Sequence, residues 1–257
     1  MKVTVCQLDN RQAERDSMLA ALGQHITAER SELLLLPEMC FADWLAADET
    51  ADHGRWLAAV KSHADYILRL EQFGADAIIA TRPIVSDDGA RRNQAYLWTP
   101  EPRIRAIHEK YYLPNEPGYF EANWYQRGAL EFDTCEALGL TIGIQICTEM
   151  WFFEWARHFA REGADLLCVP RATPHGSVDK WLAGGRSAAV CAGAYCLSSN
   201  LWTPPGSHAD CGGLGWIISP EGDVLAQTSE DEPFASCEID ADFARRSKAT
   251  YPRYVAE

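Results

Sequence analysis

The chain lacks the residue patterns that mark several classes of protein. Its nine cysteines include no pair of Cys-x-x-Cys motifs and its seven histidines show no His-x3-His spacing, so we expect no metal site. The longest apolar runs are too short to span a bilayer. A net charge of −14 argues against the basic face that binding to nucleic acid or to an anionic membrane requires. We therefore expect neither nucleic acid nor a membrane as partner.

Nothing in the sequence divides the chain into parts. It has no internal repeat, low-complexity tract or Pro/Ser-rich linker, and 47% apolar with 23% charged residues is typical of a globular protein. We expect a single domain over residues 1–257, with 243–257 as a polar and aromatic C-terminal tail suited to packing across a partner subunit. Residues 1–8 have the pattern of a first strand rather than of a signal peptide, so we expect a cytoplasmic protein.

Hydrophobic patterning predicts strands that alternate with helices. Two runs, 33–36 and 166–169, show almost no polar alternation, which is typical of strands covered on both faces. The complete set of expected strands is 3–8, 33–36, 77–84, 93–98, 104–112, 141–146, 165–169, 195–199, 215–219 and 236–239. Helices are expected at 15–30, 56–73, 151–162 and 180–193. Because residues 77–107 form an antiparallel meander among βα units, the best architecture is a layered α/β sandwich.

Three of these strands end in side chains that can do chemistry. Glu38 follows the leucine strand, Lys110 ends the third strand of the meander, and Cys147 follows residues 140–146. Ligands of α/β sheets gather at such carboxyl ends. The expected turn from strand to helix would surround Cys147 with free backbone N–H groups, and the helix dipole would favour its thiolate. A carboxylate, an ammonium and a thiol at strand ends form a coherent catalytic set.

These residues lie in motifs that resemble the carbon–nitrogen hydrolase, or nitrilase, superfamily. The motifs are Pro37-Glu38, Lys110-x-x-Leu113-Pro114 and Gly143-x-x-Ile146-Cys147-x-Glu149, in the order and at the wide spacing of that family's Glu-Lys-Cys triad. The resemblance covers nearly the whole chain. It implies a four-layer αββα sandwich, pairing into a homodimer or higher homo-oligomer, a small-molecule substrate and no cofactor.

The triad suggests a division of roles. Cys147 would attack an amide-type carbon and form a thioester, with Glu38 as general base and acid. Lys110 would stabilise the oxyanion together with the backbone N–H of Thr148. The family also implies a second glutamate after the lysine. Of the candidates Glu116 and Glu121, the stretch Pro117-Gly118-Tyr119-Phe120-Glu121 resembles that of the carbamoylputrescine amidase branch and selects Glu121.

Other residues near the triad have simpler interpretations. Glu149 and Glu154 are interpreted as charges at a helix N-terminus. Trp151 either lines the pocket or packs in the core. Thr173 follows another strand end and is a candidate for substrate contact, whereas His175 is interpreted as a loop residue.

The substrate class follows from the neighbours of Cys147. The run 147–152 resembles the Cys-x-x-x-Trp-Phe pattern of N-carbamoylputrescine amidases and lacks the arginine that carboxylate-binding branches place there. Arg171 or Arg186 remains open as a substitute anchor. The sequence thus predicts hydrolysis of a small linear amide or an N-carbamoyl (ureido) compound. Conversion of a nitrile to an acid and ammonia, or a non-catalytic protein that has kept the fold, are the alternatives.

Overall fold

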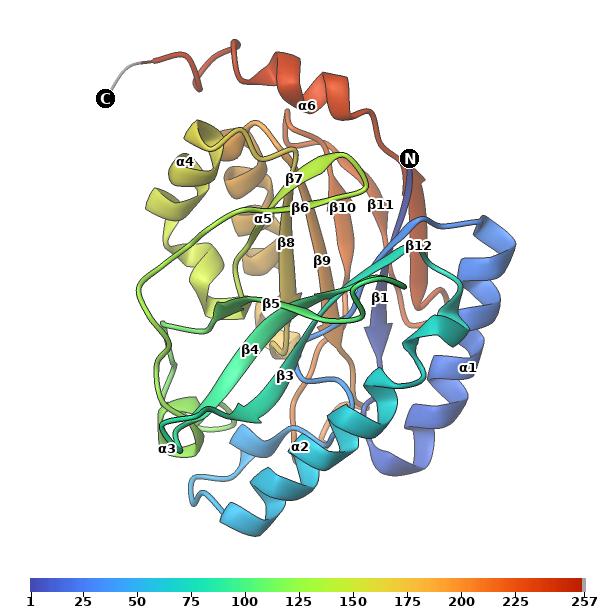
Figure 1. The fold of residues 1–257 in the computed structure, drawn as a ribbon, viewed down its shortest axis with the longest axis vertical. Helices are drawn as coiled ribbons and strands as arrows, with labels where there is room; N and C mark the ends of the chain where they lie inside the picture. Colours follow the sequence, from blue (N-terminus) through green and yellow to red (C-terminus); the bar gives the residue numbers. More distant parts are fainter. Residues whose placement is uncertain (256–257) are drawn as a thin grey trace.

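Twelve strands form two half-sheets in the computed structural model, which describes residues 1–255 (Figure 1). The first half-sheet runs in the order β5 (Arg105–Glu109), β4 (Arg91–Trp98), β3 (Ala77–Val85), β2 (Leu33–Leu35), β1 (Lys2–Leu8) and β12 (Phe234–Glu238). The second comprises β6 (Cys135–Ala137), β7 (Leu140–Ile144), β8 (Leu166–Arg171), β9 (Tyr195–Leu201), β10 (Trp216–Ile218) and β11 (Val224–Gln227). The two halves join through a short parallel pairing of β1 with β9, in which Gln7 lies opposite Asn200 and Leu8 lies opposite Leu201.

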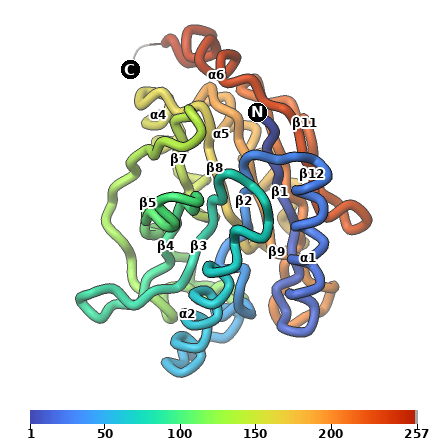
Figure 2. Tube along the Cα trace, turned by 45° about the vertical axis from the view of Figure 1, so that its right-hand side comes forward, coloured from blue at the N-terminus to red at the C-terminus, as the bar shows by residue number. Residues whose placement is uncertain are grey.

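Helices cover both outer faces of the paired half-sheets. Helices α1 (Gln12–Glu29) and α2 (His53–Ile67) lie on one side, and α4 (Phe153–Arg161) and α5 (Val178–Ala192) lie on the other (Figures 1 and 2). Successive side chains of a strand face opposite ways, so β2 contributes to two apolar cores. Leu34 packs in an outer core with residues of α1 and α2. Leu33 and Leu35 pack in a second core, which also contains residues of β7 and α5. The four-layer αββα sandwich implied by the sequence is confirmed.

Each expected strand appears in the structure, within a few residues of its expected bounds. The sequence did not reveal β6 or β11. The first has only three residues, and the second is largely exposed and so shows no buried face to alternate. The expected helix 56–73 is α2 followed by a separate 3₁₀ turn, Leu70–Phe73. Short helices α3 (Glu121–Trp124) and α6 (Ala241–Ser247) complete the described chain, together with the 3₁₀ turns Leu45–Ala47, Cys147–Trp151 and His175–Ser177.

The C-terminal segment folds back on its own chain. After α6, the Lys248 ammonium donates hydrogen bonds to the carbonyls of Ala192 and Gly193, at 2.9 and 2.8 Å, where α5 ends. Positive groups at a helix C-terminus meet carbonyls that have no partner within the helix. The expected tail 243–257 is therefore anchored on α5 over its described part, and residues 256–257 lie outside the described residues.

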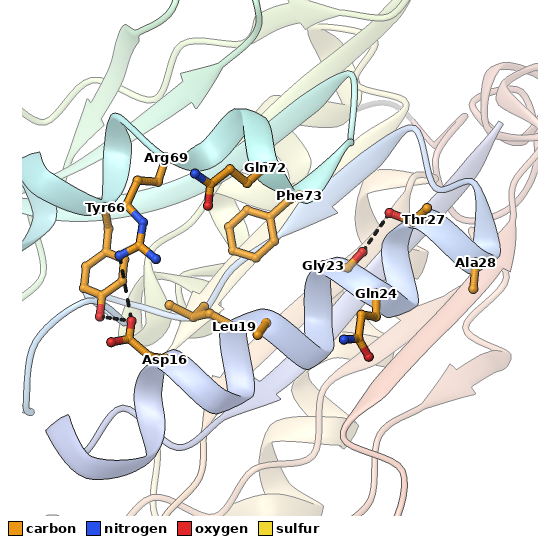
Figure 3. A pocket seen from close by; sticks show the side chains of 11 residues that line it. Asp16, Leu19, Gly23, Gln24, Thr27, Ala28, Tyr66, Arg69, Gln72 and Phe73 are labelled. Carbon is orange, nitrogen blue, oxygen red and sulfur yellow. Dashed lines mark hydrogen bonds and ion pairs between the residues drawn. The ribbon is translucent and has the colours of Figure 1, made fainter.

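A cavity of about 560 Å³ lies between α1 and the end of α2, in the outer helical layer (Figure 3). Its lining includes Tyr66, which donates a hydrogen bond to Asp16 at 2.6 Å, and it contains none of the candidate site residues. No helix within residues 1–255 is long and apolar enough to cross a membrane. In the same range, no cluster of three or more His, Cys, Asp or Glu side chains could hold a metal ion.

The packing of β7 against α4 predicts opposite effects for two glycine substitutions. A Cβ atom at Gly143 would lie 2.6 Å from the ring of Phe159, so Gly143→Ala should lower the free energy of unfolding by about 1–3 kcal/mol. At Gly23, inside α1, the nearest atom would be at 3.7 Å, and Gly23→Ala should raise stability by about 0.4–1 kcal/mol. Urea unfolding of both variants checks this. Equal effects of the two substitutions would contradict the packing argument.

Candidate active site

The carboxyl ends of three strands bring Glu38, Lys110 and Cys147 together. Glu38 lies three residues beyond β2, Lys110 directly follows β5, and Cys147 lies three residues beyond β7. Glu38 and Lys110 are fully buried and Cys147 is 3% exposed. Glu38 and Lys110 thus come from the first half-sheet and Cys147 comes from the second. A backbone hydrogen bond from Glu38 N–H to the Arg171 carbonyl, 3.2 Å, links the two halves at this point.

The Lys110 ammonium lies between two carboxylates. Its Nζ is 2.8 Å from Glu38 Oε1 and 2.6 Å from Glu121 Oε2. Burial alone would lower the pKa of Lys110, but the charges of Glu121 and Glu38 outweigh it and raise that pKa above its ordinary value. Burial, reinforced by Glu38, raises the pKa of Glu121 in spite of Lys110. The lysine therefore stays charged at the centre of the cluster.

Glu121 rather than Glu116 joins this cluster. Glu121 is fully buried at the start of α3, whereas Glu116 is exposed on a turn whose backbone pairs with Tyr119. Of the two candidates, the structure thus brings Glu121 into contact with Lys110, and its role as the second glutamate stays a prediction.

One oxygen of Glu38 is left without a partner. Its Oε1 accepts hydrogen bonds from Lys110 and from Asn93 Nδ2, the latter at 2.7 Å, whereas its Oε2 is buried and unbonded. A buried oxygen without a partner costs about 1–3 kcal/mol, and such an atom calls for an explanation. Glu121 Oε1 is buried and unbonded in the same way. The Cys147 thiol donates to the Ala172 carbonyl, with 3.7 Å between Sγ and O, and it interacts electrostatically with Glu38.

Cys147 differs from the expectation in two ways: in the protonation state of its thiol and in the kind of helical turn that it begins. Burial raises the pKa of the thiol well above its ordinary value, the charge of Glu38 adds to this, and Lys110 offsets only part. The residue begins a five-residue 3₁₀ turn, η3 (Cys147–Trp151), and the α-helix starts only at Phe153. The expected dipole-stabilised thiolate is therefore wrong: the resting group is a thiol that needs a base.

Two supporting residues of the cluster were missed in the sequence. Asn93, on β4, binds Glu38, and Tyr125, just after α3, donates its hydroxyl to Glu121 Oε2. Asn93 Nδ2 also lies 3.4 Å from the Tyr125 hydroxyl, which closes a ring of hydrogen bonds around Lys110. No motif or spacing in the sequence marks either residue. Asn93 reaches the cluster through the register of β4 against β5, and Tyr125 reaches it through the turn after α3.

The two candidate substrate contacts lie in different surroundings. Trp151 is 40% exposed and its ring tilts against Trp181 at 5.0 Å, so packing in the core, one of its two interpretations, is wrong. Thr173 is buried, and its hydroxyl accepts hydrogen bonds from Asn200 and Arg171, both at 2.9 Å. Thr148, the expected oxyanion donor, is partly buried at the second position of η3, where helical turns leave N–H groups unbonded.

Of the two alternative anchors, only Arg171 has its whole guanidinium enclosed by the protein. Arg171 is fully buried, donates to Ser198, Thr173 and the Leu214 carbonyl, and stacks over the Trp216 ring at 3.9 Å. Arg186 is exposed on α5 and donates to the Gly222 carbonyl at 2.8 Å. His175 pairs with Asp210 on the loops, which agrees with its interpretation as a loop residue.

Glu149 lies in the first turn of η3, in line with its interpretation as a charge at a helix N-terminus, but it also has a buried partner. It is fully buried, and its carboxylate binds the His108 ring at 2.8 and 3.0 Å. The other ring nitrogen of His108 faces the Glu131 carbonyl at 3.0 Å, so both nitrogens meet acceptors and both carry protons. Burial lowers the pKa of His108, but the charge and hydrogen bond of Glu149 outweigh it and raise that pKa above 6.5.

The raised pKa of His108 predicts a pH dependence of stability. The folded state holds the imidazole proton more tightly than the unfolded state, so its contribution is complete below pH 6.5 and is lost as pH rises through the folded pKa. The stability difference between the wild type and His108→Gln should therefore shrink as pH rises above about 6.5. Urea unfolding of both proteins from about pH 5.5 to about pH 9 measures it. Parallel stability curves would rule out a charged His108.

Comparisons with known proteins agree with this geometry. Residues 2–249 match the family model described as carbon-nitrogen hydrolase. The chain is 23% identical over 257 residues to a 2-oxoglutaramate amidase of Paenarthrobacter nicotinovorans, covering 95% of this chain and 82% of that protein. It is 22% identical over 240 residues to a citrullinase of Francisella tularensis, covering 88% and 84%.

A solved structure has the same fold. A mutant of an amidase from Nesterenkonia, with the acetamide moiety of fluoroacetamide added covalently at its active-site cysteine, superposes with a TM-score of 0.76 at 18% identity, over 96% of this chain and 92% of that one. The family match spans nearly all of this chain, and the structural match confirms its layers. The chain belongs to the carbon–nitrogen hydrolase family, among its amidase-like members.

Proposed function

We propose that this protein hydrolyses a small linear amide or N-carbamoyl compound through a thioester-type intermediate on Cys147. The observation that carries the proposal is the buried Lys110 ammonium held by Glu38 and Glu121, with the buried Cys147 thiol in the field of all three charges. The amidase and citrullinase relatives, which are named for an amide and a ureido substrate, support this class of compound.

In the first half of the reaction, Glu38 Oε2 takes the thiol proton as sulfur attacks the carbonyl carbon. Because the pKa of Cys147 is raised, this transfer accompanies the attack rather than preceding it. The oxyanion forms within reach of the Lys110 ammonium and the Thr148 N–H. Glu38 then returns the proton to the departing nitrogen, ammonia leaves, and the acyl group remains on sulfur.

In the second half, Glu38 removes a proton from water, which attacks the acyl carbon. The second oxyanion forms at the same place, the sulfur leaves and regains its proton from Glu38, and a carboxylic acid is released. For an N-carbamoyl compound the group on sulfur is a thiocarbamate, and its hydrolysis yields the amine and carbon dioxide. Atoms balance in both cases: one water is consumed and one ammonia is released for each turnover.

The two glutamates bind Lys110 alike, each through one oxygen, and the other oxygen of each is buried and unbonded. The charge of Glu38 raises the pKa of Cys147 more than that of Glu121 does, so we assign the proton transfer to Glu38. Glu121, whose bonded oxygen also accepts the Tyr125 hydroxyl, is assigned to fixing the ammonium in place. The lysine can then point its remaining donor at the developing oxyanion.

Ammonia release tests the proposal directly. We expect wild-type protein to release ammonia from members of a panel of short aliphatic amides, ω-amides of keto acids and N-carbamoyl amines, and Cys147→Ala to release none. Cys191→Ala, which removes a half-buried thiol of α5, is the matched control and should keep full activity. Turnover of nitriles by a protein inactive on every amide would replace the proposal with the nitrilase alternative.

Replacement of Lys110 tests the oxyanion role. Nζ is held at 2.8 and 2.6 Å in a fully buried site, so the larger, planar guanidinium of Lys110→Arg cannot occupy its place. We expect kcat to fall about 10²–10³-fold. Lys61→Arg, at an exposed lysine of α2, should leave kcat unchanged. Wild-type turnover by Lys110→Arg would remove the lysine from the mechanism.

A further inference from the structure

The Glu149 carboxylate binds the backbone next to both the nucleophile and the lysine. One oxygen accepts the N–H of Ile146, the residue before Cys147, at 2.7 Å. The other accepts the N–H of Tyr111, the residue after Lys110, also at 2.7 Å. We propose that Glu149, with His108 as its counter-ion, is a positioning residue that sets Cys147 against Lys110. The inference rests on the proposed role of Cys147 as nucleophile.

The hydrogen bonds of the sheet do not by themselves set the distance between Cys147 and Lys110. Lys110 follows β5 and Cys147 follows β7, and along the hydrogen-bonded order these strands are separated by β4, β3, β2, β1, β9 and β8. Small differences in twist accumulate over so many strands. The two hydrogen bonds of Glu149 instead join the two half-sheets within one residue of each reacting group.

The counter-ion comes from the same strand as the lysine. His108 lies two residues before Lys110 on β5, and its ring binds the carboxylate through Nε2 and the Glu131 carbonyl through Nδ1. The acidic groups near this ring are Glu149, to which it is bonded, and the neighbouring Glu109. A buried carboxylate that lost its cation would be an uncompensated charge, which is strongly destabilising. The pair is therefore a unit, with one member on each half-sheet.

The turn that holds the thiol needs such support. Cys147 has a φ of +52°, in the left-handed region that costs a residue with a Cβ about 1–2 kcal/mol. The preceding residue is tied to Glu149 twice: Ile146 N–H donates to its carboxylate, and Glu149 N–H donates to the Ile146 carbonyl at 3.2 Å. Loss of the carboxylate frees one end of this turn. The thiol then moves relative to Glu38 and Lys110.

The inference predicts a change in reactivity rather than in substrate binding. In Glu149→Gln, the amide nitrogen cannot accept a backbone N–H, so one of the two ties is lost. We expect kcat to fall about 10–100-fold, with KM within about threefold of the wild type, because small displacements of reacting groups have effects of that size. The rate at which iodoacetamide alkylates Cys147, followed by peptide mass spectrometry, should fall in parallel.

A second variant and two controls keep the test decisive. His108→Gln removes the counter-ion and should lower both rates about tenfold. Glu149→Asp keeps the charge on a shorter side chain and should recover part of the loss. Glu154→Gln, five residues after Glu149, removes an exposed carboxylate in the first turn of α4, and both rates should stay at wild-type values. If Glu149→Gln fails to fold, the kcat and the alkylation rate of His108→Gln test the inference in its place.

The alkylation rate separates this inference from the proposed substrate class. It needs no substrate, so it still reports on the turn if every amide in the panel proves inert. A lower melting temperature with unchanged alkylation and kcat would make the pair purely structural and overturn the inference. An unreactive Cys147 in the wild type would remove the nucleophile itself, and the inference with it.

Discussion

The buried Lys110 ammonium between Glu38 and Glu121 is the interaction on which the rest of the site depends. An isolated ammonium in this environment would be too costly to keep charged, and two isolated carboxylates would repel each other. Together they hold one another in place at 2.8 and 2.6 Å. Asn93 and Tyr125 bind the two carboxylates from the outside, and one oxygen of each, Glu38 Oε2 and Glu121 Oε1, stays buried and unbonded.

Burial explains why the thiol and the free oxygen can coexist. The same desolvation that raises the pKa of Cys147 also strengthens every charge interaction in the cluster. Transfer of the thiol proton to Glu38 moves a negative charge from oxygen to sulfur but leaves the total charge of the cluster unchanged. The cost of burying charge therefore does not oppose the step, and Lys110 stays close to the charge wherever it resides.

The fold supplies these groups from two half-sheets that share little direct pairing. Glu38, Asn93 and Lys110 come from the first, Cys147 comes from the second, and only β1 and β9 connect the two along the hydrogen-bonded order of the described strands. Local bridges near the site, from Glu38 N–H to Arg171 and from Glu149 to Tyr111, lie where the reacting groups meet. An αββα sandwich with a site at this junction needs such bridges more than a site at the end of one sheet would.

The sequence by itself determined ten of the twelve described strands and the chemistry of the three strand ends, and its family resemblance gave the four layers. Hydrophobic runs such as 33–36 are local signals, and a charged or reactive residue placed directly after one is visible without a structure. The family motifs then selected Glu121 over Glu116. Tertiary structure alone decided the protonation of Cys147 and the place of Glu149, because pKa values depend on burial and on charges that come from other strands. It also decided the roles of Asn93 and Tyr125, since the register between strands is a property of the folded sheet and not of any one segment.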